Sequence, residues 1–79
     1  MVEAYVLLNV MPGYEVQTVE KLKSIKGVSE VDELYGEWDA ILKIQAGTLE
    51  EMNGILTDKI RSVKEIKETS TMIVAKYKR

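Results

Sequence analysis

Hydrophobic residues along the chain repeat with two different spacings, one typical of strands and one typical of helices. Aliphatic residues crowd the segments expected to be extended, whereas from Val16 to Ile25 they recur every three residues, as on one face of a helix. Pro12-Gly13 and Gly27 are turn signals between these segments. The pattern predicts the order strand, helix, strand, strand, helix, strand, over residues 4–10, 16–25, 28–34, 40–44, 48–60 and a last strand from about 63 or 66 to 77.

The two halves of the chain show a faint internal repeat. Gly27–Val31 aligns with Ser62–Ile66, so each half places a helix before a strand that begins with V-x-E-(V/I). This order predicts an α+β fold of the ferredoxin-like βαββαβ type. In such a fold both helices cover one face of a four-stranded antiparallel sheet.

The face that the helices leave uncovered should read polar if the protein is a monomer. Alternation along the strands allows one consistent assignment, with Val6, Leu8, Leu42, Ile44, Met72 and Val74 under the helices. The uncovered face would then carry apolar Tyr5, Leu7, Ile41, Ile73 and Ala75, together with polar Asp39, Thr69 and Thr71. A face of this mixture predicts a dimer formed sheet to sheet, with a polar site at its margin. The alternative is ordinary half-buried packing.

Composition favours self-association as well. A chain of 79 residues buries a thin core, and without Cys or His it has no disulfides and no thiolate or imidazole metal ligands. The net charge of −2 and the absence of a basic run argue against direct nucleic-acid binding. The apolar runs are too short for a membrane span, and the N-terminus carries no signal segment, so we expect a cytoplasmic protein. The high share of charged residues, 30%, is compatible with a thermophile.

Enzymatic chemistry is not indicated. Nucleophilic Cys and general-base His are absent, the serines lack an elbow motif, and no glycine pattern would cradle phosphate. Most carboxylates, including Glu15, fall on helix faces, where solvated charge is the usual explanation. We therefore expect no catalytic residue and no cofactor.

The segment between the two central predicted strands, Tyr35-Gly36-Glu37-Trp38-Asp39, holds the chain's one Trp beside two carboxylates. Gly36 suits a tight turn, and Trp38 would suit an oligomer contact. Asp39 has the stronger functional case, because a carboxylate at the start of an apolar strand needs a partner.

This segment resembles the hinge of the effector domain of Lrp/AsnC-type (feast/famine) transcriptional regulators, also called the RAM domain. Gly36-Glu37-Trp38-Asp39, followed by the aliphatic run 40–44, fits that family's G-x-(Y/F/W)-D pattern. Thr69-Ser70-Thr71 is similar to its T-x-T strand. The resemblance covers residues 1–79 as a single domain and leaves no room for a helix-turn-helix, so it implies a stand-alone RAM domain without a DNA-binding domain.

The resemblance also implies a ligand and partners. In the family an amino-acid effector lies between subunits, near the hinge and the last strand. That likeness picks out as ligand-binding residues Tyr35, Gly36, Glu37, Trp38, Asp39, Thr69 and Thr71. A carboxylate would hold the ammonium group, while backbone amides and hydroxyls would hold the ligand carboxylate.

The implied assembly is a dimer and a larger ring, such as an octamer or decamer, which would modulate full-length Lrp/AsnC regulators. Two alternatives stay open at this point. One is a dimeric α+β barrel enzyme, and the other is an oligomerisation or adaptor module without a ligand.

Overall fold

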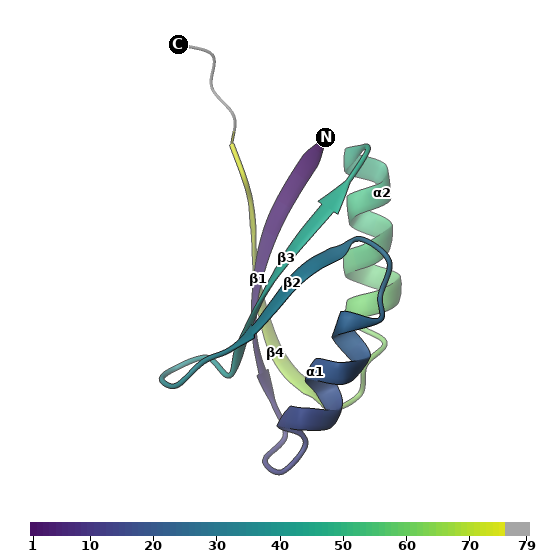
Figure 1. The fold of residues 1–79 in the computed structure, drawn as a ribbon. Coiled ribbons are helices and arrows are strands. Elements are labelled where there is room, and N and C mark those ends of the chain that lie inside the picture. The colour runs from purple at the N-terminus through teal and green to yellow at the C-terminus, as the bar shows by residue number, and fades with distance from the viewer. Residues whose placement is uncertain (76–79) are drawn as a thin grey trace.

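The computed structural model describes residues 1–75, whose helices and strands follow the order that the sequence predicts (Figure 1). The strands are β1 (Val2–Val10), β2 (Val28–Glu33), β3 (Ala40–Ala46) and β4 (Ile66–Ile73). The helices are α1 (Glu15–Lys23) and α2 (Leu49–Gly54), which continues as the π-helical segment η1 (Ile55–Ile60). The sequence pattern extends the last strand to Tyr77, which lies outside the described residues.

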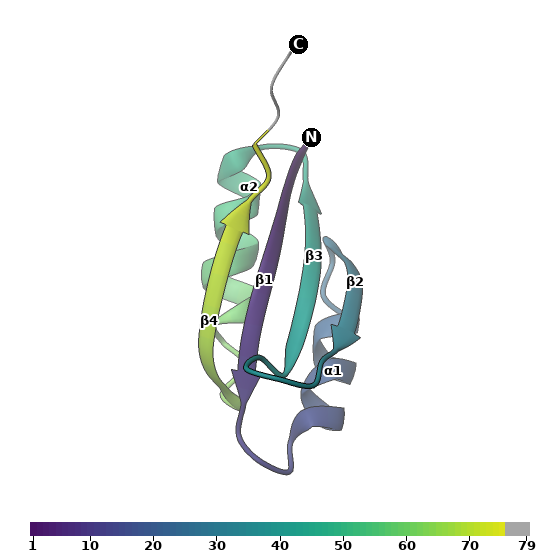
Figure 2. The same ribbon diagram turned by 90° about the vertical axis from the view of Figure 1, so that its left-hand side faces the viewer.

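The four strands form one antiparallel sheet in the order β2-β3-β1-β4. Both helices lie on the same side of this sheet and leave its other side uncovered (Figures 1 and 2). The predicted ferredoxin-like α+β fold is therefore confirmed. Within the described part of the chain, no helix has the length and apolar character needed to cross a membrane.

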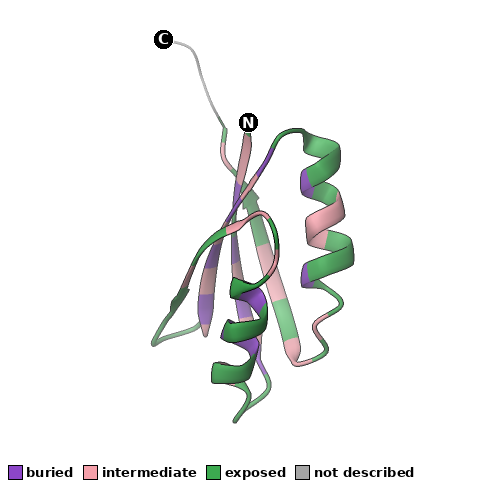
Figure 3. Cartoon of the chain, turned by 45° about the vertical axis from the view of Figure 1, so that its right-hand side comes forward, coloured by how far each residue is buried: buried purple, intermediate pink, exposed green. Residues whose placement is uncertain are grey.

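The core fills the space between the sheet and the helices, as the buried positions in Figure 3 show. Alternate residues of β1 from Ala4 to Val10, and of β3 from Ala40 to Ala46, are almost fully buried. Leu22, Met52 and Ile60 cover them from the helical side. The two central strands thus form a rigid scaffold that positions the loops at their ends.

The helices differ from the sequence pattern in detail. α1 ends at Lys23, earlier than predicted, and Val16, expected on its apolar face, is 70% exposed. Thr18 is buried in its place. Thr48 caps the start of α2: its hydroxyl accepts a hydrogen bond of 3.1 Å from the Glu51 backbone N–H and so satisfies a free donor of the first turn.

The faces of β4 are the reverse of the predicted ones. Thr69, Thr71 and Ile73 pair directly with buried residues of β1, and directly paired residues project to the same face of a sheet. They therefore point toward the helical side, while Met72 pairs with Tyr5 on the uncovered side. The prediction that Thr69, Thr71 and Ile73 lie on the uncovered face, with Met72 under the helices, is wrong.

A β-bulge explains this reversal. Ile66 pairs with Val10 and Glu68 pairs with Asn9, so Lys67 is an extra residue in β4. An extra residue shifts the alternation of side chains by one position, and every later residue of the strand changes face. The bulge lies opposite the end of β1, where the loop after β2 makes its contacts.

The uncovered face has an apolar centre and a polar border. Tyr5 and Leu7 of β1 and Ile41 of β3 lie on it as predicted, and Met72 joins them from β4. Tyr5 is 37% exposed and Met72 is 47% exposed. The border consists of the polar residues of the same faces, Glu3, Asn9, Lys43, Gln45 and Glu68. At one end of this face the Gln45 amide donates to the Glu3 carboxylate at 2.8 Å, and the Lys43 ammonium lies 5.9 Å from the Tyr5 ring centre.

Candidate functional site

Residues 34–39, here called the hinge loop, connect β2 to β3. The loop extends to the side of the sheet opposite the helices and crosses the end of β1 (Figures 1 and 2). The Leu34 N–H donates to the Asp39 carbonyl at 2.8 Å and closes the loop at its base. Gly36 at φ 134° allows the chain to reverse, because a residue without Cβ tolerates positive φ. Tyr35 projects fully into solvent.

Asp39 holds the hinge loop against β1. Its Oδ2 accepts a hydrogen bond of 2.8 Å from the Val10 backbone N–H. Its own N–H donates to the Leu8 carbonyl at 2.9 Å and to Asn9 Oδ1 at 3.1 Å. These bonds join the loop to the end of β1, opposite the bulge of β4. The sequence predicted that Asp39 needs a partner, and for one of its oxygens that partner is the Val10 backbone N–H.

A cavity of about 450 Å³, here called the hinge cavity, opens beside the loop. Its lining consists of Glu15, Glu33, Leu34, Tyr35 and Asp39. Three of these five side chains are carboxylates, and no Lys or Arg of residues 1–75 is among them. The described residues contain no group of three or more acidic side chains arranged to hold a metal ion. The three carboxylates that line the cavity can accept hydrogen bonds from a cationic group such as an ammonium group.

Of the residues predicted to bind ligand, Tyr35 and Asp39 line the hinge cavity together. Gly36, Glu37 and Trp38 belong to the same loop but do not line this cavity, and Trp38 is half-buried. The loop is thus the common element of the predicted site, although only part of it faces the cavity.

Thr69 and Thr71 lie elsewhere. They line a smaller cavity of about 200 Å³ between β4 and η1, together with Thr57 and Arg61. This cavity is on the helical side of the sheet, whereas the hinge loop extends to the other side (Figure 1). Within one chain the two threonines and the hinge loop do not form a joint site.

Two carboxylates of the hinge cavity were missed from the sequence. The sequence pattern indicated that Glu15 is a solvent-exposed charge on a helix face. In the structure Glu15 is the first residue of α1, and its carboxylate accepts a hydrogen bond of 3.1 Å from the Gly13 N–H. Glu33 ends β2 directly before the loop. β1 and β2 run in the same direction, so their carboxyl ends lie at the same end of the sheet. The turn into α1 follows β1 and the hinge loop follows β2. The predicted topology therefore already places the start of α1 near the hinge loop.

This fold and hinge define a ligand-binding domain of the Lrp/AsnC class. Residues 3–78 match the family described as the Lrp/AsnC ligand binding domain, and the chain belongs to that family. An HTH-type transcriptional regulator of Pyrococcus furiosus is 36% identical over 73 residues, which cover 89% of this chain and 49% of the regulator. The crystal structure of FFRP-DM1 superposes with a TM-score of 0.91 at 40% identity, covering 95% of this chain and 100% of that one.

The chain spans about half the length, or less, of the curated regulators it matches. A homocitrate synthase of Saccharolobus islandicus contains a segment 36% identical over 63 residues, covering 80% of this chain but 13% of the enzyme. Because the similarity covers so small a share of the enzyme, it is no basis for assigning the enzyme's activity to this chain. Regulators from Pyrococcus agree with the thermophilic composition.

Proposed function

We propose that this domain binds a free amino acid at the hinge cavity and that binding shifts its self-assembly. The observation that carries the proposal is the lining of the cavity, where three carboxylates stand beside two apolar side chains. An α-amino acid presents an ammonium group and a side chain, which match these two kinds of surface. Membership of the Lrp/AsnC ligand-binding family supports the same class of ligand.

Glu33, Glu15 and the free oxygen of Asp39 would share the ammonium group. Leu34 and Tyr35 would contact the ligand side chain, since both are exposed at the cavity wall. The ligand carboxylate would be held by backbone N–H groups of residues 35–38, which donate to no backbone acceptor among the described residues. Asp39 then has two roles, with one oxygen on β1 and the other on the ligand.

A second copy of the chain would complete the site. Among residues 1–75 no cationic side chain lines the cavity to meet the ligand carboxylate, and Tyr35 extends from it into solvent. The uncovered sheet face supplies an apolar surface for a dimer, and the exposed hinge loop supplies a contact for a larger ring. Thr69 and Thr71 would reach the ligand in such an assembly only from a neighbouring copy.

The same assembly would connect the domain to transcription. The likeness to one half of HTH-type regulators supports association with full-length Lrp/AsnC regulators, whose oligomers the domain would modify in response to ligand. The similar segment within an enzyme of different activity supports a module that senses ligands rather than one that catalyses a reaction.

Isothermal titration against the twenty amino acids, with light scattering on the same samples, tests the proposal. We expect heat from one or a few amino acids and a change of mass with the same ligands. Glu33→Gln should weaken binding about tenfold, because it removes a charged partner of the ammonium group.

Glu37→Gln is the matched control, since Glu37 is in the same loop but does not line the cavity. Equal loss in both variants, or no heat with any amino acid, would reject the hinge cavity as the site. A stable oligomer without any heat would favour the adaptor module instead.

A further inference from the structure

The two edges of the sheet differ in their protection against a further strand. An edge strand presents unpaired N–H and C=O groups, and natural proteins shield it by shortness, charge or irregular pairing. β2, at one edge, has six residues, a register shift after Val28 and three acidic side chains. β4, at the other edge, has eight residues, and residues 69–75 form a run without any charge, Gly or Pro. β2 is therefore shielded, whereas β4 is an open edge (Figure 2).

The outward hydrogen-bonding groups of β4 belong to Thr69, Thr71 and Ile73. Val74 donates its N–H to the Glu3 carbonyl at 2.8 Å, so every second residue of β4 counted back from Val74 points its backbone groups to β1. The residues between them point theirs away from the sheet, and these groups have no hydrogen-bond partner among residues 1–75. A row of donors and acceptors at this spacing matches another extended strand.

The side chains along this edge are exposed on both faces of the sheet. Ile73 on the helical side and Met72 on the uncovered side are each 47% exposed, and Thr71 is exposed as well. A group bound to one face of the sheet could cover only one of the two large apolar side chains. A strand added along the edge would contact both of them at once.

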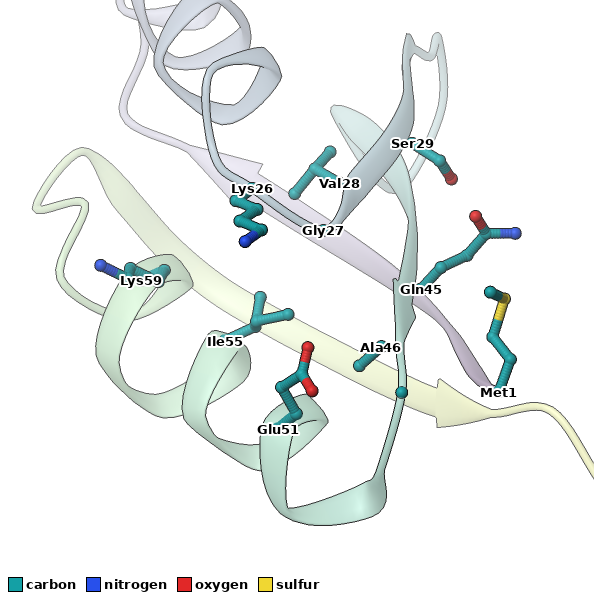
Figure 4. Close-up of a pocket in the computed structure, with 11 residues that line it drawn as sticks. Met1, Lys26, Gly27, Val28, Ser29, Gln45, Ala46, Glu51, Ile55 and Lys59 are labelled. Carbon is teal, nitrogen blue, oxygen red and sulfur yellow. The ribbon is translucent and has the colours of Figure 1, made fainter.

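The β4 edge is separate from the two largest cavities of the described residues. The lining of the hinge cavity includes no residue of β4. A cavity of about 630 Å³, drawn in Figure 4, lies between the turn before β2, the end of β3 and one side of α2 and η1, and its lining includes no residue of β4 either. A contact along β4 therefore does not depend on the ligand proposed for the hinge cavity.

We propose that β4 of one copy pairs with β4 of a second copy, antiparallel and about a two-fold axis at Thr71. Thr71 then faces the partner's Thr71, Ile73 faces the partner's Thr69, and Met72 faces the partner's Ser70. In this register the outward N–H and C=O groups of one copy bond to those of the other, and the facing side chains pack in pairs. The two sheets become one continuous sheet of eight strands.

A second β4 fits this edge better than the β2 strand of a neighbour would. β2 would bring its acidic side chains and its irregular pairing to the contact. In the β4 pair, residues 69–73 meet only uncharged residues, and the nearest charge, Glu68, lies opposite the partner's Val74. The edge contact also leaves the centre of the uncovered face available around Tyr5 and Leu7, so both contacts can form in one assembly.

A single cysteine tests the register, because the 79-residue sequence has no Cys. Cα atoms of a hydrogen-bonded antiparallel pair lie about 5.5 Å apart, within the range that a disulfide spans. Under mild oxidation Thr71→Cys should form covalent dimers on a denaturing gel. Ser24→Cys, equally exposed but directly after α1, is the matched control and should stay mostly uncrosslinked. Equal cross-linking of the two variants, or none in either, would overturn the proposal.

Charge variants test the two-fold axis, because residue 71 meets its own copy there. Thr71→Lys alone and Thr71→Glu alone each place like charges opposite each other, so each should lose the edge contact and show a lower mass in light scattering. An equimolar mixture of the two should regain the wild-type mass. Ser24→Lys should keep that mass throughout. Folding should survive because Thr71 is exposed, and thermal unfolding checks this.

The outcomes separate the possible occupants of the edge. A wild-type mass for each Thr71 variant alone would reject the pairing of β4 with itself. A lower mass that the mixture does not restore would also reject it and would assign the edge to a different strand. Either result leaves the proposed ligand site at the hinge cavity standing, since amino-acid titration tests that site separately.

Discussion

Asp39 Oδ2 accepts a hydrogen bond of 2.8 Å from the backbone N–H of Val10 and so joins two parts of the chain that are far apart in sequence. Val10 is 6% exposed and ends β1 opposite the β-bulge of β4, where the regular pairing of the two strands is interrupted. The carboxylate thus satisfies a nearly buried donor that the irregular strand leaves available. In the same contact it sets the position of the hinge loop over the uncovered side of the sheet.

Asp39→Ala should destabilise the protein. The substitution leaves the Val10 N–H without its acceptor, which costs about 1–3 kcal/mol for a buried donor. For a chain of this size each kcal/mol corresponds to a fall in Tm of about 4–8 °C. Thermal unfolding at one fixed protein concentration measures it, since self-association makes Tm depend on concentration.

Asp39→Asn separates the two roles of this residue. Its side-chain carbonyl can still accept from the Val10 N–H, so most of the stability should return, whereas the charge available to a ligand ammonium is lost. An Asn variant as unstable as the Ala variant would mean that the charge, rather than the hydrogen bond, holds the loop.

The sequence predicted the elements whose signals are local. Turn residues such as Gly27 and Gly36 mark where strands begin or reverse, and both occur at positive φ. The cap at Thr48 also has a local signal, because Thr48 and Glu51 have the spacing of a capping box. The hinge was recognisable for the same reason, because its glycine, aromatic and acidic residues are consecutive.

What the sequence could not show depends on contacts between distant segments. β4 carries apolar residues at both alternations, so only the bulge opposite Asn9 decides that Ile73 faces the helices and Met72 the uncovered side. Glu15 joins the hinge cavity through the closure of the β1–α1 turn, and no local pattern marks it. The same bulge decides that Thr69 and Thr71 point toward the helical side of the sheet.

Met72→Glu should reduce self-association. Met72 is 47% exposed and lies next to Tyr5 at the centre of the uncovered face. Burying a new carboxylate between two sheets has a large desolvation cost, so a dimer formed through this face should dissociate at micromolar concentration. Size-exclusion chromatography with light scattering gives the mass.

Leu49→Glu is the control for that experiment, because Leu49 is 53% exposed on α2, on the helical side of the sheet. Glutamate in the first turn of a helix is favourable, so this variant should keep the wild-type mass. An unchanged mass for Met72→Glu would mean that the assembly does not use the uncovered face.

The ion pair between Lys21 and Glu65 should make stability depend on pH. The Lys21 ammonium lies 2.9 Å from Glu65 Oε1, and this hydrogen bond is the main reason that the pKa of Glu65 lies below its usual 4.5. A carboxyl whose pKa is lower in the folded state stabilises the protein fully above 4.5 and loses that effect as pH falls through the lowered value.

Lys21→Gln should therefore raise the pKa of Glu65 and make the fall of Tm between about pH 5 and pH 3 shallower. Carboxyl chemical shifts in an NMR titration report the pKa directly. Lys23→Gln removes a lysine whose ammonium lies 3.9 Å from exposed Glu20, and it should leave the Glu65 titration unchanged. If both variants change it equally, general charge rather than the Lys21 contact is responsible.

Gly27→Ala and Gly36→Ala should differ in cost although both glycines have positive φ, 101° and 134°. At Gly36 nothing lies within 4 Å of the added Cβ, so the cost is the backbone conformation alone, about 1–2 kcal/mol. At Gly27 the new carbon would also meet Ile55 Cδ1 at 2.6 Å and the Gln45 carbonyl at 3.3 Å. Since the carbonyl belongs to β3 and cannot move aside as the Ile55 side chain can, Gly27→Ala should lower the free energy of unfolding by more than Gly36→Ala. Denaturant unfolding of the two variants tests the order, and an equal loss would mean that Ile55 and the end of β3 shift enough to accommodate the extra carbon.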